Sequence, residues 1–174
     1  RIRLTSFDMV QRIQTVYMLA SVIAILMLFL FPLAVFETPE AIFELNAFGL
    51  SSVTPEFPLD VMQWALLVIL LIMIGLPLVT IFMYKKQKRQ LRMLIFATVL
   101  DVLFYGFFYF FQFEACEDII FSLLTSKTLA SSSGMLTILM PALSAFCNVM
   151  AMRGVYYDIA LLASADRLRP SRKK

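Results

Sequence analysis

Residues 84–92, YKKQKRQLR, form a short basic bridge between long apolar runs. Five of the eight residues from 85 to 92 are lysine or arginine, and the positive-inside rule assigns such a segment to the cytoplasmic side of a membrane. Two apolar runs lie on each side of the bridge, each 18 to 24 residues long. Because about 20 residues cross a hydrocarbon core about 30 Å thick, the sequence predicts four spans with both termini on the side of the bridge.

The composition argues against a soluble fold and excludes several kinds of active site. Of 174 residues, 61% are hydrophobic and 16% charged, which is more apolar than a soluble domain of this size. Histidine is absent, so this chain alone cannot form a bis-histidine haem, a histidine zinc site or a serine–histidine dyad. It also shows no phosphate loop, activated-serine motif or facing carboxylates. We therefore expect no catalytic residue, no metal and no cofactor.

The predicted fold is an all-α membrane protein, a four-transmembrane-helix bundle with cytoplasmic N and C termini. Fourteen of the fifteen basic residues fall on the cytoplasmic side, and only Lys127 does not, which sets the orientation. We expect nine segments: cytoplasmic segment 1–14, span 15–36, periplasmic loop 37–60, span 61–84, basic loop 85–92, span 93–113, periplasmic loop 114–134, span 135–157, and amphipathic helix with basic tail 158–174.

The first outer segment, residues 37–60, differs in character from the spans. It contains three prolines and five acidic residues but no lysine or arginine. The piece IFELNAFGL at 42–50 alternates weakly between apolar and polar residues, which is compatible with a short hairpin or an interfacial turn. Because one such segment cannot form a stable sheet alone, we predict that most of 37–60 is loop.

Asp101 is the one ionisable residue predicted deep in a span, about nine residues or roughly 13 Å from the inner interface. A carboxylate at that depth is costly unless it is protonated or paired. Asn148 lies at about the same predicted depth and can donate to it, while Arg153 lies one turn nearer the cytoplasm. The carboxylate either accepts protons or ions, or forms an interhelical hydrogen bond. We expect the hydrogen bond, because a relay needs several groups.

Two other features have alternative interpretations. The stretch FYGFFYFFQF at 104–113 holds eight aromatic residues in ten positions. It can pack a cofactor on a neighbouring chain, but we interpret it as an interfacial aromatic belt. The basic residues flank apolar runs instead of forming a face of their own, so we interpret them as topology signals and expect no nucleic-acid partner.

Three segments resemble a Bacteroidetes family of uncharacterised small four-span inner-membrane proteins, a domain of unknown function. They are MVQRIQTVYML at 9–19, the bridge YKKQKRQLR, and MRGVYYDIALLASADRLR at 152–169. The resemblance implies four helices, a multi-pass location in the bacterial inner membrane, and no established activity. It also implies a family signature on the cytoplasmic rim, made of Gln11, Arg12, Gln14, Asp166, Arg167 and Arg169.

From these observations we expect a non-catalytic accessory or structural subunit of a larger membrane complex, with a respiratory or other energy-converting complex as one candidate host. Its partners would be the lipid bilayer and other membrane-protein subunits. The alternative is a small transporter or proton-linked channel that uses Asp101. The expected docking surface is the cytoplasmic rim, made of Arg12, Lys85, Lys86, Arg89, Arg92, Asp166, Arg167 and Arg169.

Overall fold

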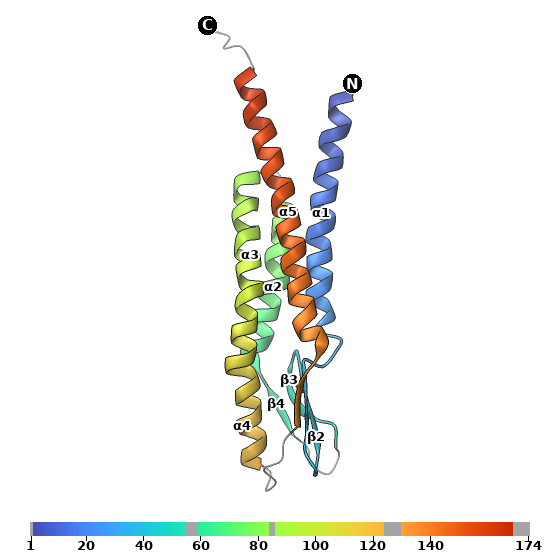
Figure 1. The fold of residues 1–174 in the computed structure, drawn as a ribbon, viewed down its shortest axis with the longest axis vertical. Coiled ribbons are helices and arrows are strands. Elements are labelled where there is room, and N and C mark those ends of the chain that lie inside the picture. The colour runs from blue at the N-terminus through green and yellow to red at the C-terminus, as the bar shows by residue number, and fades with distance from the viewer. Residues whose placement is uncertain (1, 55–58, 84–85, 124–129, 169–174) are drawn as a thin grey trace.

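The computed structural model describes residues 2–54, 59–83, 86–123 and 130–168, which form a long bundle of helices with a small β-sheet at one end (Figure 1). The helical elements are α1 (Ile2–Met27), α2 (Trp64–Phe82), α3 (Gln87–Phe107), the π-helix η1 (Phe108–Phe113), α4 (Glu114–Leu123) and α5 (Met135–Leu168). The strands are β1 (Ala34–Glu37), β2 (Ile42–Asn46), β3 (Gly49–Ser52), β4 (Asp60–Met62) and β5 (Ala130–Ser133).

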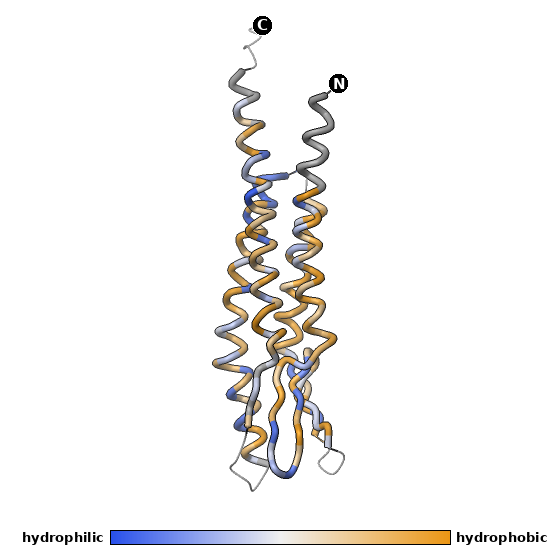
Figure 2. The backbone as a smooth tube through the Cα atoms, turned by 45° about the vertical axis from the view of Figure 1, so that its right-hand side comes forward, coloured by the Kyte–Doolittle hydropathy of each residue, from blue (hydrophilic) through white to orange (hydrophobic). Residues whose placement is uncertain are grey.

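Three helical stretches are long and apolar enough to cross a membrane. Among the described residues these are Trp64–Phe82, Gln87–Ser122 and Met135–Leu161, whereas the apolar part of α1, Ile13–Met27, is shorter. Apolar residues form a continuous band along the helices, and polar residues gather toward both ends (Figure 2). The chain is therefore a membrane protein by length and hydropathy.

The helices pack in a ring, in which α1 contacts α2 and α5, and α3 contacts α2 and α5. Each helix turns a narrow stripe inward, as the buried residues of α2 show at steps of three and four: Leu66, Leu70, Met73, Pro77 and Thr80. The first turn of α1, the last turn of α5 and the start of α3 lie toward the same end of the molecule (Figure 1). We call this end the bridge end, and the opposite end the sheet end.

The segments α3, η1 and α4 continue into one another as a single helical rod. The apolar stretch Gln87–Ser122 has 36 residues, which is about 54 Å at 1.5 Å per residue and exceeds the roughly 30 Å of a hydrocarbon core. The rod therefore extends beyond the predicted span 93–113, and its last part lies beside the sheet (Figure 1). The predicted loop 114–134 thus contains α4 and β5.

The sheet has five antiparallel strands in the order β4-β3-β2-β1-β5. Its inward face carries large apolar side chains that are almost fully buried, namely Phe36, Phe43, Leu45 and Leu50. They belong to the same hydrophobic cluster as Cys116 and Ile120, which lie four residues apart on one face of α4. The sheet is stable because this helix covers its apolar face.

Gly49 is required for the tight connection between β2 and β3. Its φ of +152° is a conformation that side chains with a Cβ rarely adopt. A Cβ on Gly49 would also lie 2.1 Å from the carbonyl oxygen of Val61 on β4. The close approach of β3 and β4 therefore depends on this glycine.

The sheet makes the all-α prediction wrong, and with it the prediction that 37–60 is mostly loop. The hairpin β2–β3 lies within that segment, but most residues of its pairing partners β1 and β4 lie outside it. β1 begins in the predicted span 15–36, and β5, which pairs with β1, lies in the second outer segment. Strands from parts of the chain far apart in the sequence complete the sheet, so the segment does not have to form it alone.

The first two predicted spans also end differently in the structure. α1 ends at Met27, before Pro32, and residues 34–37 pair as β1. Proline has no backbone N–H to continue the helix, and the strand provides partners for the backbone groups that follow. The predicted span 61–84 begins with the end of β4, and its helix α2 runs over Trp64–Phe82.

Candidate functional site

Asp101 lies in the second half of α3 and is only 1% exposed. Its Oδ2 atom accepts two hydrogen bonds from α5. Asn148 Nδ2 donates at 3.0 Å, and Ser144 Oγ donates at 3.1 Å. The structure therefore brings Asp101 and Asn148 together, and the contact joins α3 to α5 inside the apolar band.

A third helix joins this site through Ser21 on α1. The hydroxyl oxygens of Ser21 and Ser144 lie 2.8 Å apart, and both residues are fully buried. Because the single hydroxyl proton of Ser144 goes to Asp101, Ser21 is the donor to Ser144. A hydrogen-bonded chain thus connects α1, α5 and α3. We call the four residues Ser21, Asp101, Ser144 and Asn148 the polar junction.

Sequence reasoning missed Ser21 and Ser144. A signal was present for Ser144, since it lies four residues before Asn148 and therefore on the same helix face. Ser21 lies among apolar residues of α1. Its contact with Ser144 depends on how α1 packs against α5, and the sequence alone does not show which helices pack together.

One atom of the polar junction has no hydrogen-bond partner in the described part of the chain. Asn148 Oδ1 is buried and unpaired, and an unsatisfied buried polar group costs about 1 to 3 kcal/mol. The junction therefore retains one free acceptor beside the carboxylate.

A second buried polar contact joins α1 and α5 nearer the bridge end. Gln14 Nε2 donates to Asp158 Oδ2 at 2.8 Å, and the two residues are 5% and 3% exposed. Gly154 lies against Gln14, where a Cβ would come within 2.6 Å of Gln14 Cγ. The absence of a side chain at Gly154 therefore gives Gln14 room to reach Asp158.

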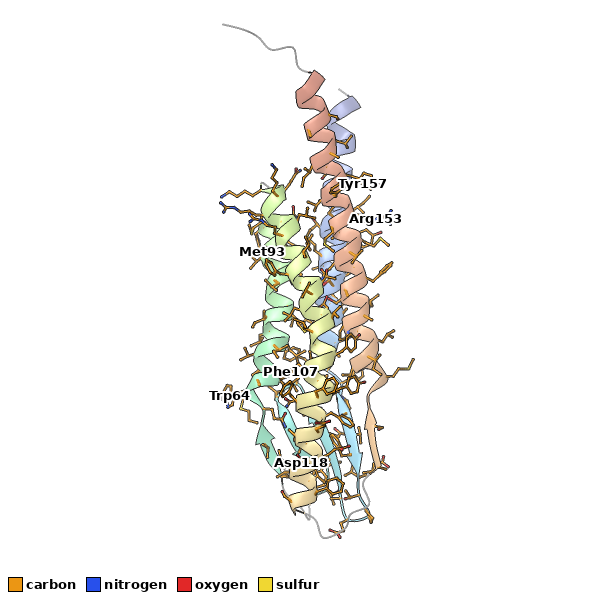
Figure 3. All side chains as sticks on the ribbon, turned by 60° about the vertical axis from the view of Figure 1, so that its left-hand side comes forward. Trp64, Met93, Phe107, Asp118, Arg153 and Tyr157 are labelled. Atoms are coloured by element: carbon orange, nitrogen blue, oxygen red, sulfur yellow. The ribbon has the colours of Figure 1, made fainter. Side chains whose placement is uncertain are left out.

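Arg153 does not join the polar junction. It is exposed, and no described residue forms a hydrogen bond or salt bridge with it. Instead it lines a surface groove of about 400 Å³ between α3 and α5, together with Leu91, Val149, Met152, Tyr156 and Tyr157. Figure 3 shows Arg153 and Tyr157 on α5 near the bridge end, with Met93 of α3 at a similar level.

The predicted docking rim is described only in part. Lys86, Arg89 and Arg92 are exposed around the start of α3. Arg12, Asp166 and Arg167 lie in α1 and α5, but their side chains are outside the described set, and Lys85 and Arg169 lie outside the described residues altogether. The described side chains of the predicted rim are therefore those of Lys86, Arg89 and Arg92.

The aromatic block 104–113 divides into two groups. Phe104 and Phe108 are fully buried, stack with ring centroids 5.8 Å apart, and belong to the main core. Phe110 and Phe111 are 71% and 68% exposed. The buried group joins the bundle to the sheet, since Phe113 also packs on Phe36 of β1 with centroids 5.2 Å apart.

The sequence of this chain matches a known family over most of its length, residues 10–168. The chain belongs to the DUF4293 family, a domain of unknown function. Comparison of the DUF4293 chain with curated proteins and with solved structures gave no match. The polar junction, the Gln14–Asp158 contact and the groove around Arg153 all lie within the matched residues of this DUF4293 protein.

Proposed function

We propose that this DUF4293 protein is a non-catalytic accessory subunit of a larger complex in the bacterial inner membrane, which it spans four times with both termini in the cytoplasm. One observation carries the proposal: the buried carboxylate of Asp101 is enclosed by Ser144 and Asn148. Such contacts stabilise helix packing by about 1 kcal/mol or less each. The polar groups inside the bundle therefore hold helices together, and the outer surface is left for partners.

The distribution of charge supports the proposed orientation. The described basic residues at the bridge end include Lys86, Lys88, Arg89, Arg92 and Arg153. The sheet end carries acidic residues and, within its described part, no lysine or arginine. The positive-inside rule then assigns the bridge end to the cytoplasm. In the proposed topology the fourth span is the apolar part of α1, Ile13–Met27, together with the apolar residues 28–33 that follow it.

The outer surface offers two places for partner subunits. One is the cytoplasmic rim, where Lys86, Arg89 and Arg92 are exposed. The other is the sheet, whose outermost strands β4 and β5 each pair on one side only within the described residues. Unpaired strand edges are places where another chain can add a strand.

Co-purification from native membranes tests the proposal. The tagged chain is solubilised gently and pulled down, and the eluate is separated on a native gel and identified by mass spectrometry. We expect a stoichiometric assembly with the wild type, and its loss when Arg167 and Arg169 are both replaced by glutamate. Lys127→Glu is the matched control, because it reverses a charge on the other side. A single small species, or unchanged partners in the double variant, would contradict the proposal.

The alternative function is a small proton-linked transporter. It is favoured by the continuous chain from Ser21 through Ser144 to Asp101, beside the unpaired Asn148 Oδ1. Vesicles that contain the purified protein test it under an imposed pH gradient. A transporter loses its pH-dependent flux in Asp101→Asn, whereas an accessory subunit shows no flux in the wild type and only altered stability in the variant.

A further inference from the structure

The groove between α3 and α5 at the bridge end is apolar except at one point. Leu91, Val149 and Met152 supply aliphatic walls, and Tyr156 and Tyr157 supply aromatic ones, while Arg153 is the one charged residue lining it. The groove has a volume of about 400 Å³, within the range of small-molecule sites. Val149, Tyr156 and Tyr157 of its lining are exposed on the surface of the bundle, so its occupant must be compatible with a bilayer.

Arg153 lies near the bridge end, at about the level of Met93 on α3 (Figure 3). It is five residues, or about 7.5 Å along the axis, from Asn148 of the polar junction. It lines the groove together with Leu91, which precedes Arg92 in the sequence, so Arg153 and Arg92 begin at similar levels. A cation beside the apolar band is costly unless an anion pairs with it or its side chain extends to the interface.

No described residue supplies that anion, because Arg153 has neither a hydrogen bond nor a salt bridge in the described part of the chain. Tyr156 and Tyr157 are 63% and 60% exposed beside it, and tyrosine is enriched where acyl chains meet headgroups. Lys88 is exposed one turn from Leu91 toward the bridge end. The groove thus combines an acyl-chain surface with positive charge at headgroup depth.

We propose that this groove binds an anionic phospholipid of the leaflet at the bridge end, with an acyl chain on the aliphatic walls and the phosphate on Arg153. Arginine donates two parallel hydrogen bonds to phosphate oxygens, and basic pockets between transmembrane helices bind anionic headgroups. A zwitterionic lipid has the same phosphate, but its positively charged ammonium group would lie near Arg153 and Lys88. Phosphatidylglycerol lacks that cation and is therefore preferred.

Native mass spectrometry of the purified full chain in detergent tests this proposal. The protein is titrated separately with phosphatidylglycerol and phosphatidylcholine that carry the same acyl chains. We expect the wild type to bind phosphatidylglycerol about fivefold more tightly, as one favourable charge near a headgroup provides. Arg153→Gln should remove the preference, and Arg153→Lys should retain most of it.

Two further variants distinguish lipid binding in the groove from a general attraction of lipid to positive surface charge. Val149→Trp fills the groove and keeps every charge, so it should weaken binding of both lipids. Lys127→Gln removes a positive charge predicted at the other side and should leave the preference unchanged. Thermal unfolding confirms that each variant is folded. Equal binding of the two lipids by the wild type, or undiminished binding by Val149→Trp, would overturn the proposal.

Discussion

Gln14 on α1 donates a hydrogen bond to Asp158 on α5 at 2.8 Å, although 144 positions separate them in the sequence and both are nearly buried. The contact ties the first and last helices near the bridge end. It depends on Gly154, which leaves the space that the Gln14 side chain occupies. Together with the polar junction it fixes α1 against α5 at two levels.

The first prediction concerns Gly154. Gly154→Ala places a Cβ 2.6 Å from Gln14 Cγ, so Gln14 must move and its hydrogen bond to Asp158 weakens. We expect a loss of about 1 kcal/mol in the free energy of unfolding, measured by denaturant titration in detergent. On a Gln14→Ala background the same change should cost nothing, because no side chain remains to be displaced. An equal cost in both backgrounds would contradict this mechanism.

The polar junction gives a second prediction. Asn148→Leu removes one of the two described donors to Asp101 and should lower the free energy of unfolding by about 1 kcal/mol. Replacing all four residues of the polar junction, as Asp101→Leu with Ser21→Ala, Ser144→Ala and Asn148→Leu, should cost less, because none of its buried groups is then left unpaired. Phe146→Leu, on an exposed face of α5, is the control and should have little effect.

This second prediction distinguishes the two proposed functions. If the quadruple variant is stable and still joins its complex, the polar junction serves helix packing. If the variant is stable but inactive in a flux measurement, the carboxylate itself is needed, and the transporter proposal is favoured.

A third prediction uses two glycines that differ in their surroundings. Gly49→Ala combines a φ of +152° with a Cβ 2.1 Å from a backbone oxygen, so we expect a loss of about 2 to 3 kcal/mol. Gly75→Ala in α2 meets nothing within 4 Å and should be neutral or up to about 1 kcal/mol stabilising. Hydrogen exchange should show β3 and β4 opening in Gly49→Ala alone, and unchanged protection there would refute the role of Gly49.

The membrane orientation gives a fourth prediction. In a background without Cys116 and Cys147, Ser132→Cys places an exposed thiol on the sheet and Lys88→Cys places one at the bridge end. An impermeant maleimide added to spheroplasts should label Ser132→Cys at once and Lys88→Cys only after the membrane is disrupted. The reverse pattern would show that the bridge end lies on the periplasmic side. Labelling of both cysteines from one side would exclude the proposed topology.

The prediction and the structure agree on the features that follow from the fixed rise per residue of an α-helix. Runs of apolar residues have the length needed to cross a membrane, and three helical stretches confirm this. Residue counts from the cytoplasmic interface placed Asp101 on α3 and Asn148 on α5 at similar depths, because the rise per residue is fixed. In the structure the two side chains form a hydrogen bond. Ser21 could not be found this way, since depth alone does not state which helices are neighbours.

The sheet was missed because its signal is spread over the chain. Each strand has three to five residues, which is too few to show a strong alternation of apolar and polar residues. β1 also continues an apolar run whose length predicts a membrane span. β5, with the sequence ASSS, is not apolar enough to predict a strand. Its pairing with β1 depends on α4 and α5, which bring residues 130–133 back toward Ala34–Glu37.

That pairing gives the fifth prediction. Val35 on β1 and Ser132 on β5 lie directly opposite each other, and opposed residues in antiparallel strands have Cα atoms about 4.5 to 5.5 Å apart, within the range that a disulfide spans. In a background without Cys116 and Cys147, Val35→Cys with Ser132→Cys should form a disulfide on mild oxidation. Protease digestion and mass spectrometry would detect the linked peptides.

The matched control is Val35→Cys with Ala130→Cys. Ala130 lies two residues from Ser132 along β5, on the same face of the sheet. Such diagonal neighbours are about 7 to 8 Å apart, too far for a disulfide without backbone movement. Selective cross-linking of the first pair would establish that β1 and β5 are neighbours in this register. Equal cross-linking of the two pairs would show that the outer segments approach each other without forming this sheet.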